Sequence, residues 1–446
     1  MLTRTRYPHV RYALAIAALV LMPATARVTA STRQVSVESL IYDLKSPDAV
    51  RRQAAAKELG AVKYRPAIPQ LVPLARDPIA AVRREVELAL ENMDDAQTLP
   101  GFIALSSDTE TDIRSRALAS LVNLHVAHAF GMSATLMNLR ERVIFGADRD
   151  LEIIVEPDVP VDPEVIDTLR ARIGDSERGI RSIAIRGLGI LRARSAVPDL
   201  LQVVREDRDD GLRFEGVRSL RKIGDSSIGG DLLALLNINN DDVRNELIAT
   251  IGSMRYGGAL AELTRIVESS TKTDMSRVLA LGALADLGDP SSAPLFERLK
   301  DNRDEALRLY ANEGIARTAN PEMKTQISAA RLVEKSARVR MAHAFALLRL
   351  GENEYLEELV RGLDRRQTRD LAKEYLLETQ GASRRALFAP RTASPAARAE
   401  LADVMGLMGD PEALPTLRSM AQDADKDVAH AAARATRRIT MVSGSQ

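Results

Sequence analysis

Apolar residues recur at helical spacing in short blocks along most of this chain, and the block from Asp175 to Arg205 shows the pattern clearly. Ile180, Ile183 and Leu188 give a first helix one apolar stripe. A break follows, and Pro198 stands in the first turn of a second apolar helix, where its missing N–H costs nothing. Two helices this short cannot bury both stripes alone. The pattern therefore predicts a helix pair that stacks on copies of itself.

The copies follow one another at nearly constant spacing. The position that ends each first helix, often the glycine of a Leu-Gly-Asp sequence, occurs at Lys63, Asp94, His125, Arg192, Gly224, Arg255, Gly288, Ala319, Gly351, Gly381, Gly409 and Thr440. Successive steps are 28 to 33 residues long, except for one step of 67. We therefore expect an all-α fold, a right-handed α-solenoid of about twelve helix pairs with one irregular insert.

Arginine stands eleven residues before the end of the first helix in ten of these repeats. The members of this arginine column are Arg52, Arg83, Arg114, Arg181, Arg213, Arg244, Arg277, Arg308, Arg340 and Arg398. Aspartates such as Asp77 and Asp108 precede the helices, where a carboxylate caps free N–H groups. We interpret the column as a structural ladder in which each arginine pairs with an acid of a neighbouring repeat. The alternative interpretation is a column that binds an anionic ligand.

The repeat unit resembles a known family. Asp242-Val243-Arg244, Leu287-Gly288-Asp289-Pro290 and Ala293-Pro294-Leu295 match the HEAT repeat, and more narrowly its short form first associated with phycobilisome lyases. The resemblance covers nearly all of the chain beyond residue 36 and implies a solenoid. It implies little about function, because HEAT arrays serve unrelated tasks. HEAT-like hydroxylases place His-Glu pairs on successive repeats for a di-iron site, and this sequence contains no His-Glu.

The step of 67 residues places an insert at residues 126–161. Its large apolar residues are Phe130, Met132, Met137 and Phe145. Methionine and phenylalanine are common anchors at binding surfaces, so these four are candidate partner-binding residues. The alternative is a packing element that fills a distorted stack.

The first 30 residues predict a signal peptide. A basic start with Arg4, Arg6 and Arg11 precedes an apolar run too short to span a bilayer, and cleavage is expected after Ala26 or Ala30. The protein is then exported, to the periplasm or the cell exterior, with no stable membrane span after cleavage. The remaining division is repeats one to three at 36–125, the insert at 126–161, repeats four to twelve at 162–440, and a disordered tail at 441–446.

Composition excludes several classes of function. The 62 basic and 62 acidic residues balance, which argues against nucleic acid as a partner. With no cysteine, thiolate metal sites and cysteine nucleophiles are excluded. The sequence Asp148-x-Asp150-x-Glu152 resembles the start of a calcium loop but has Ile153 where that loop needs glycine. We predict no metal site, no cofactor and no catalytic residue.

The predicted function is an exported, non-catalytic scaffold of bacterial type. It binds another protein along a concave face formed by the second helices, with a contribution from the insert. Two alternatives remain open at this point: a periplasmic enzyme or lyase-like factor that uses residues 126–161, and a structural spacer in an envelope assembly. The sequence identifies neither the partner nor the oligomeric state.

Overall fold

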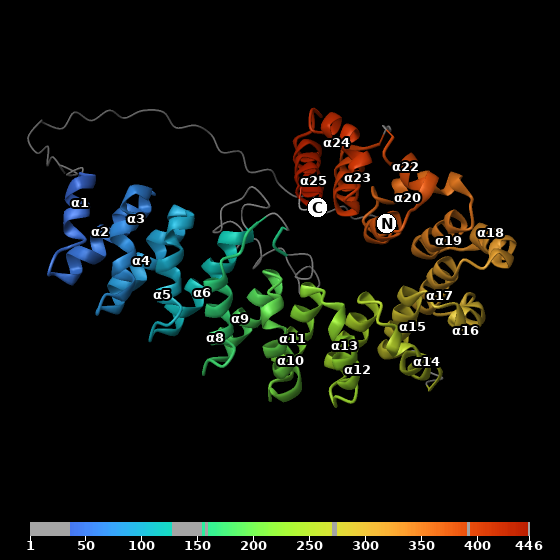
Figure 1. The fold of residues 1–446 in the computed structure, drawn as a ribbon, viewed down its shortest axis with the longest axis horizontal. Coiled ribbons are helices and arrows are strands. Elements are labelled where there is room, and N and C mark those ends of the chain that lie inside the picture. Colours follow the sequence, from blue (N-terminus) through green and yellow to red (C-terminus); the bar gives the residue numbers. More distant parts are fainter. Residues whose placement is uncertain (1–35, 127–153, 157–158, 270–273, 390–392, 445–446) are drawn as a thin grey trace, which may run out of the picture.

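A computed structural model describes residues 36–126, 154–156, 159–269, 274–389 and 393–444. Within these ranges the chain forms helices and no strands, so the prediction of an all-α solenoid is confirmed. The helices alternate between two rows that run along the whole array (Figure 1).

The first helices form one row. They are α2 (Ala49–Ala61), α4 (Ala80–Met93), α6 (Thr111–Val126), α9 (Arg178–Ile190), α11 (Asp210–Ile223), α13 (Asp241–Ser253), α15 (Met275–Leu287), α17 (Glu305–Thr318), α19 (Ala337–Arg349), α21 (Arg369–Leu377), α23 (Pro395–Met408) and α25 (Lys426–Gly444).

The second helices form the other row and are mostly shorter. They are α1 (Val37–Asp43), α3 (Ile68–Leu71), α5 (Leu99–Leu105), α8 (Pro163–Arg172), α10 (Val197–Glu206), α12 (Gly229–Ala234), α14 (Leu260–Ser269), α16 (Ala293–Leu299), α18 (Lys324–Val333), α20 (Leu356–Gly362), α22 (Gly381–Leu387) and α24 (Leu414–Met420). Most of them follow a single 3₁₀ turn, such as Pro290–Ser292 before α16.

The array curves into an arc with the first helices on its inner side. From α8 to α18 the second helices lie on the outer side of this arc (Figure 1). Close packing between first helices explains the direction of the curvature. A Cβ atom at Gly60 or Gly252 would lie 2.6 Å from Ala89 or Ala283 of the next first helix, so glycine permits this approach. The expectation that second helices form the concave face is therefore wrong for this stretch.

The predicted ends of the first helices coincide with a backbone feature. Ten of these positions have positive φ, the left-handed conformation that commonly ends a helix. Five of the ten are glycine and five are not, among them Arg255 and Ala319, each with φ of 50°. The sequence position was recognisable because glycine adopts this conformation at little cost.

The insert interrupts the third repeat between its first helix α6 and its second helix α8. Residues 127–153 lie outside the described part of the chain. At the other end of the insert, the amide of Val155 donates to the carbonyl of Ile190 at 2.8 Å, and the Val155 side chain is buried. At the C-terminus α25 continues to Gly444, so the tail predicted from residue 441 is largely helical.

Candidate partner-binding surface

Arg83 shows how the arginine column is built. Its Nη1 donates to the carbonyls of Asp77 (2.9 Å) and Pro78 (3.4 Å), just before its own helix. Its Nε and Nη2 donate to the two carboxylate oxygens of Asp108 in the next repeat, at 2.5 and 2.7 Å. The same carboxylate accepts the amide of Glu110 at 2.9 Å. One guanidinium thus joins two successive turns, and we call such an arginine–carboxylate pair a rung.

Six arginines of the column form rungs. The shortest N–O distances run from 2.5 to 3.9 Å, and the pairs are Arg52–Asp77, Arg83–Asp108, Arg114–Asp175, Arg181–Asp207, Arg308–Glu334 and Arg398–Asp423. The third rung joins residues on either side of the insert. Stacking is therefore continuous past the insert, as the repeat period requires.

Four of the rung carboxylates, Asp77, Asp108, Glu334 and Asp423, have a pKa below the ordinary value. Burial raises the pKa of Asp108, but hydrogen bonds from Arg83 and from the Glu110 amide, together with the charge of Arg83, hold it below its ordinary value. The same opposing effects, again with burial as the largest, leave the pKa of Asp77 and that of Glu334 lowered. Each buried acid therefore depends on its arginine.

Three successive arginines make other contacts, and here the ladder prediction is wrong. Arg213 donates to the Val204 carbonyl at 2.9 Å and pairs with Asp210 of its own helix at 3.0 Å. Arg277 donates to the Val267 carbonyl at 3.0 Å. The remaining one, Arg244, pairs with Asp241 of its own helix, an acid whose side chain is 82% exposed. Among the described residues these three arginines form no ion pair with the following repeat.

The arginine spacing alone does not reveal these missing rungs, but the positions of the acids in the sequence do. In a complete rung, the carboxylate stands six residues before the next column position, as Asp77 does before Arg83. In three successive repeats this position holds Ile238, Thr271 and Asn302 instead. None of these is a carboxylate, so Arg213, Arg244 and Arg277 lose their acceptors together.

Arg340 is a further exception with a different geometry. Its Nη1 donates to the carbonyls of Glu334 (2.8 Å) and Lys335 (2.9 Å), as in a rung. The structure gives it no ion pair with any described residue. Its guanidinium therefore has the orientation of a rung without the carboxylate.

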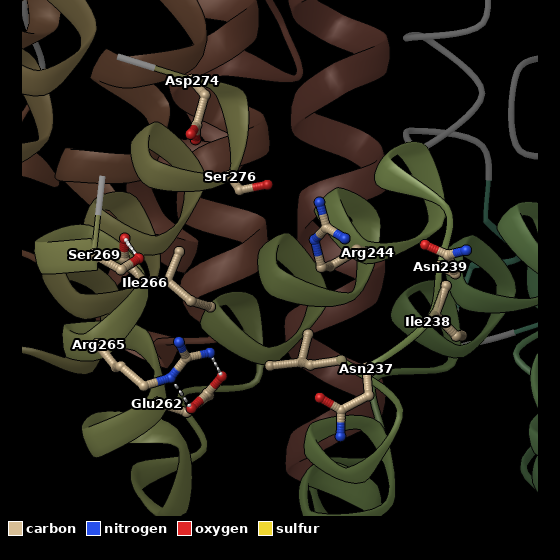
Figure 2. Close-up of a pocket in the computed structure, with 11 residues that line it drawn as sticks. Asn237, Ile238, Asn239, Arg244, Glu262, Arg265, Ile266, Ser269, Asp274 and Ser276 are labelled. Carbon is tan, nitrogen blue, oxygen red and sulfur yellow. Dashed lines mark hydrogen bonds and ion pairs between the residues drawn. The ribbon is translucent and has the colours of Figure 1, made fainter. Parts of the chain in front are cut away.

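A groove opens beside Arg244, with a volume of about 400 Å³ (Figure 2). Arg244 projects from α13 between Asn239 and Ser276, while Arg265 and Glu262 of α14 pair with each other at 2.8 Å. This Arg244 groove is lined by Leu236, Asn237, Ile238, Asn239, Arg244, Glu262, Arg265, Ile266, Ser269, Asp274 and Ser276. Its two arginines balance its two acids. Apart from these four charged residues, the polar groups of the groove are side-chain amides and hydroxyls, which form hydrogen bonds.

Similar grooves lie between other second helices, because helices on the outer side of an arc diverge. The groove at Arg52, of about 670 Å³, contains the complete Arg52–Asp77 rung. The Arg244 groove differs in that its arginine has no acid from the next repeat. Both grooves are large enough for side chains of a partner. The Arg244 groove is therefore distinguished by its missing carboxylate and not by its size.

The inner side of the arc carries a buried charged cluster around Arg317. This arginine lies within 3.4 Å of carboxylate oxygens of Asp286, Glu313, Glu374 and Glu378. Burial raises the pKa of Glu313 to about 8, against the opposing charge of Arg317. Because Glu374 of α21 and Glu378 directly after that helix are two of these acids, the cluster fastens α21 to α15 and α17.

The predicted insert residues Phe130, Met132, Met137 and Phe145 lie outside the described part of the chain. The described end of the insert contacts the far end of the array. Arg438 of α25 donates through Nε and Nη2 to both carboxylate oxygens of Glu156, each at 2.6 Å. This end of the insert is thus a packing element that links the third repeat to the last helix of the stack.

Metal-binding clusters and membrane-spanning helices are absent from the described ranges. No group of three or more His, Cys, Asp or Glu residues there has the arrangement of a metal site. His125 instead bonds through Nδ1 to the Leu121 carbonyl at 2.8 Å. No helix in those ranges has the length and apolar character needed to cross a membrane. The predicted signal peptide is not part of them.

Comparisons with known proteins find one family model and several solved structures. A HEAT-repeat family model matches residues 37–122, 160–227 and 387–444. No curated protein matches the chain. Among solved structures, an engineered protein is 16% identical, with 91% of this chain and 98% of that one aligned and a TM-score of 0.38. A chain from the complex of Kap95p with RanGDP is 14% identical, with 91% and 56% aligned and a TM-score of 0.45.

A human deoxyhypusine hydroxylase is also similar, at 18% identity over 55% of this chain and 96% of that one, with a TM-score of 0.28. These likenesses concern the fold alone. The family match on both sides of the insert and the two stacked rows of helices lead to one conclusion: the chain is a HEAT-repeat protein.

Proposed function

We propose that this protein is an exported, non-catalytic scaffold that binds another protein on the outer side of its arc, in the grooves between second helices. The observation that carries the proposal is the Arg244 groove. It lies where the column keeps its arginine but loses the carboxylate that occupies this place in six other repeats. Arg213 and Arg277, which also lack the acid, bond backbone carbonyls instead, whereas Arg244 bonds only the exposed Asp241 among the described residues.

The chemistry of the Arg244 groove favours a peptide as the ligand. The side chains of Asn237 and Asn239 offer hydrogen-bond donors and acceptors for a peptide backbone. Ser276, whose hydroxyl donates to Asn245, offers an acceptor. Arg244 adds a charged donor, because its partner Asp241 is exposed to solvent and holds it weakly. The inner side of the arc is less suitable, since ion pairs around Arg317 and Arg438 already occupy it.

The test is to recover the partner by pull-down with the tagged mature chain and to measure its affinity for groove variants. Combining Asn239→Ala with Arg244→Met should weaken binding at least tenfold, about 1.4 kcal/mol. The exposed turn residue Arg303 lies outside the groove, so Arg303→Ala serves as the matched control. Equal affinity of the groove variant and the control would place the partner elsewhere.

The insert is the second proposed contact, through Phe130, Met132, Met137 and Phe145. Deleting residues 128–152 keeps Val155 and Glu156, whose contacts with Ile190 and Arg438 support the stack. We expect a folded array with at least tenfold weaker partner binding. Unchanged affinity in a folded deletion variant would remove the insert from the interface.

Export rests on the basic and apolar pattern of residues 1–30. Mature protein purified from its own cells should begin at Arg27 or Ser31. Sequencing that returns Met1 would contradict export through a cleaved signal peptide.

A further inference from the structure

The groove beside Arg340 differs from its counterparts in charge. This Arg340 groove has a volume of about 240 Å³ and is lined by Arg331, Ala337, Arg340, Met341, Glu358, Arg361, Gly362, Arg365 and Thr368. Four arginines thus face a single glutamate. The Arg244 groove has two basic and two acidic residues, and the groove beside Arg170 has one arginine and three acids. Of these three grooves, the Arg340 groove has the largest excess of positive charge.

Most of that charge has no intramolecular partner. Arg331 pairs with Glu358, and its guanidinium stacks 5.2 Å from the centre of the Tyr355 ring. The exposed Arg361 and Arg365 form no ion pair within the described ranges. Arg361 donates only to the Glu357 carbonyl of its own helix, at 3.2 Å. A carboxylate entering the groove would not have to displace an acid from either residue.

Arg340 is already oriented for a carboxylate. Its Nη1 bonds the carbonyls of Glu334 and Lys335, just as Nη1 of Arg83 bonds those of its own turn. In Arg83 this leaves Nε and Nη2 for the two oxygens of Asp108. In Arg340 the same two groups bond no described protein atom. By comparison with the Arg83 rung, the Nε and Nη2 groups of Arg340 are placed to bind a carboxylate.

A local change in the chain explains why Arg340 has no carboxylate partner. The counterpart of the rung acid is Asp364, six residues before the column position 370. Its carboxylate accepts the Ser394 hydroxyl instead of Arg340. The turn around it is held by the Thr368 hydroxyl on the Gly362 carbonyl at 2.9 Å, which separates Asp364 from the arginine column.

We propose that the Arg340 groove binds an aspartate or glutamate side chain of an acidic segment in a partner protein. Arg340 binds the carboxylate through two hydrogen bonds in a bidentate geometry, and Arg361 and Arg365 supply further positive charge. Leu332 and Val333, which are 83% and 78% exposed, follow Arg331 directly and give an apolar contact beside the charge. Such a combination suits a polypeptide better than a small inorganic anion. This inference rests on the proposed function only in that the ligand belongs to a protein.

The binding test uses a synthetic peptide, so it does not require the natural partner. A fluorescent peptide copying residues 105–113 carries the Asp108 turn that fills the Arg83 rung. We expect the intact protein to bind it measurably at low salt and to bind the Asp108→Asn peptide at least fivefold more weakly. Arg340→Met should remove this difference. Arg244→Met should not, so failure here is separable from failure of the Arg244 groove.

A second variant guards against misfolding, because Arg340 also supports its own turn. Arg365 is exposed and makes no side-chain bond within the described ranges, so Arg365→Met should leave the thermal melt unchanged and weaken the aspartate peptide about twofold. Equal binding of the two peptides, or full binding by both variants, would overturn the proposal. Tighter binding of a phosphoserine peptide than of the aspartate peptide would also overturn it, by assigning the groove to phosphate.

Discussion

The groove at Arg52 and the groove at Arg340 are built on the same repeat unit, but only in the first does the column arginine pair with a carboxylate of the next repeat. In the first, Asp77 reaches back from the next turn and takes Nε and Nη2 of the arginine at 2.7 and 2.9 Å. In the second, the arginine is held by the same backbone contacts, but Asp364 is bonded to Ser394. An arginine in this column is therefore structural or available to a partner depending on the turn that follows it.

The largest expected difference between the two kinds of repeat is in stability. Arg83→Ala leaves Asp108 buried without its partner and should lower the free energy of unfolding by about 3 kcal/mol. Arg244→Ala should cost less than about 1 kcal/mol, because its only acid is exposed. Urea unfolding of both variants measures the difference. Equal losses, as the uniform ladder implies, would mean that the contacts of Arg244 are stronger than the structure shows.

The stability contributions of these two kinds of repeat should also depend differently on pH. The pKa of Asp108 is lowered in the folded state, so its contribution is present above its unfolded value of 3.8 and is lost as pH falls through the lower folded value. Asp108→Asn should therefore destabilise the protein by about 2 kcal/mol at pH 7, and by progressively less below pH 4. Asp241→Asn, at the exposed acid beside Arg244, should cost less than about 0.5 kcal/mol throughout. A pH-independent effect of Asp108→Asn would argue against an ionic rung.

A missing rung can be restored by one substitution. Asn302 already holds the place of a rung acid, since its side chain accepts the Asp304 amide at 2.9 Å and its carbonyl accepts Nη1 of Arg308 at 2.6 Å. Asn302→Asp should provide a carboxylate for Arg277 and raise stability by about 1 kcal/mol. The gain should disappear when Arg277 is changed to methionine. A gain that persists in that background would come from the helix end rather than from a rung.

Among the alanine variants of column arginines, a small effect is also expected at Arg340. Without a carboxylate partner, Arg340→Ala loses two hydrogen bonds to exposed turn carbonyls and should change stability by about 0.5–1 kcal/mol. Thermal melts beside Arg83→Ala provide the comparison. A loss as large as that of Arg83→Ala would show that Arg340 has an internal acid after all.

The repeat period and the arginine column could be predicted from the sequence because both are local and recur. Most first helices end near a backbone position with positive φ, which favours glycine, and Gly224, Gly288 and Gly409 mark it directly. The direction of curvature could not be predicted, since both rows have similar apolar stripes. It depends on close approaches such as Gly252 to Ala283, which connect one repeat with the next.

Contacts between distant repeats were also beyond sequence reasoning. Arg317 contacts Glu374 of α21 and Glu378 just after it, 57 and 61 residues further along the chain. Glu156, near the third repeat, contacts Arg438 in the last helix. No periodic pattern encodes such pairs. The absence of the rung acids could, however, be predicted from the sequence. Asp77 and Asp108 stand six residues before a column arginine, and Ile238 and Asn302 occupy the same position without a carboxylate.

Two double-mutant cycles test the central claim most directly, namely that the carboxylate of the next repeat decides whether a column arginine is structural. One cycle replaces Arg83 and Asp108, and the other replaces Arg340 and Asp364, each residue by alanine. We predict a coupling energy of about 2 kcal/mol for the first pair and none above about 0.3 kcal/mol for the second. Strong coupling between Arg340 and Asp364, or its absence between Arg83 and Asp108, would contradict the account.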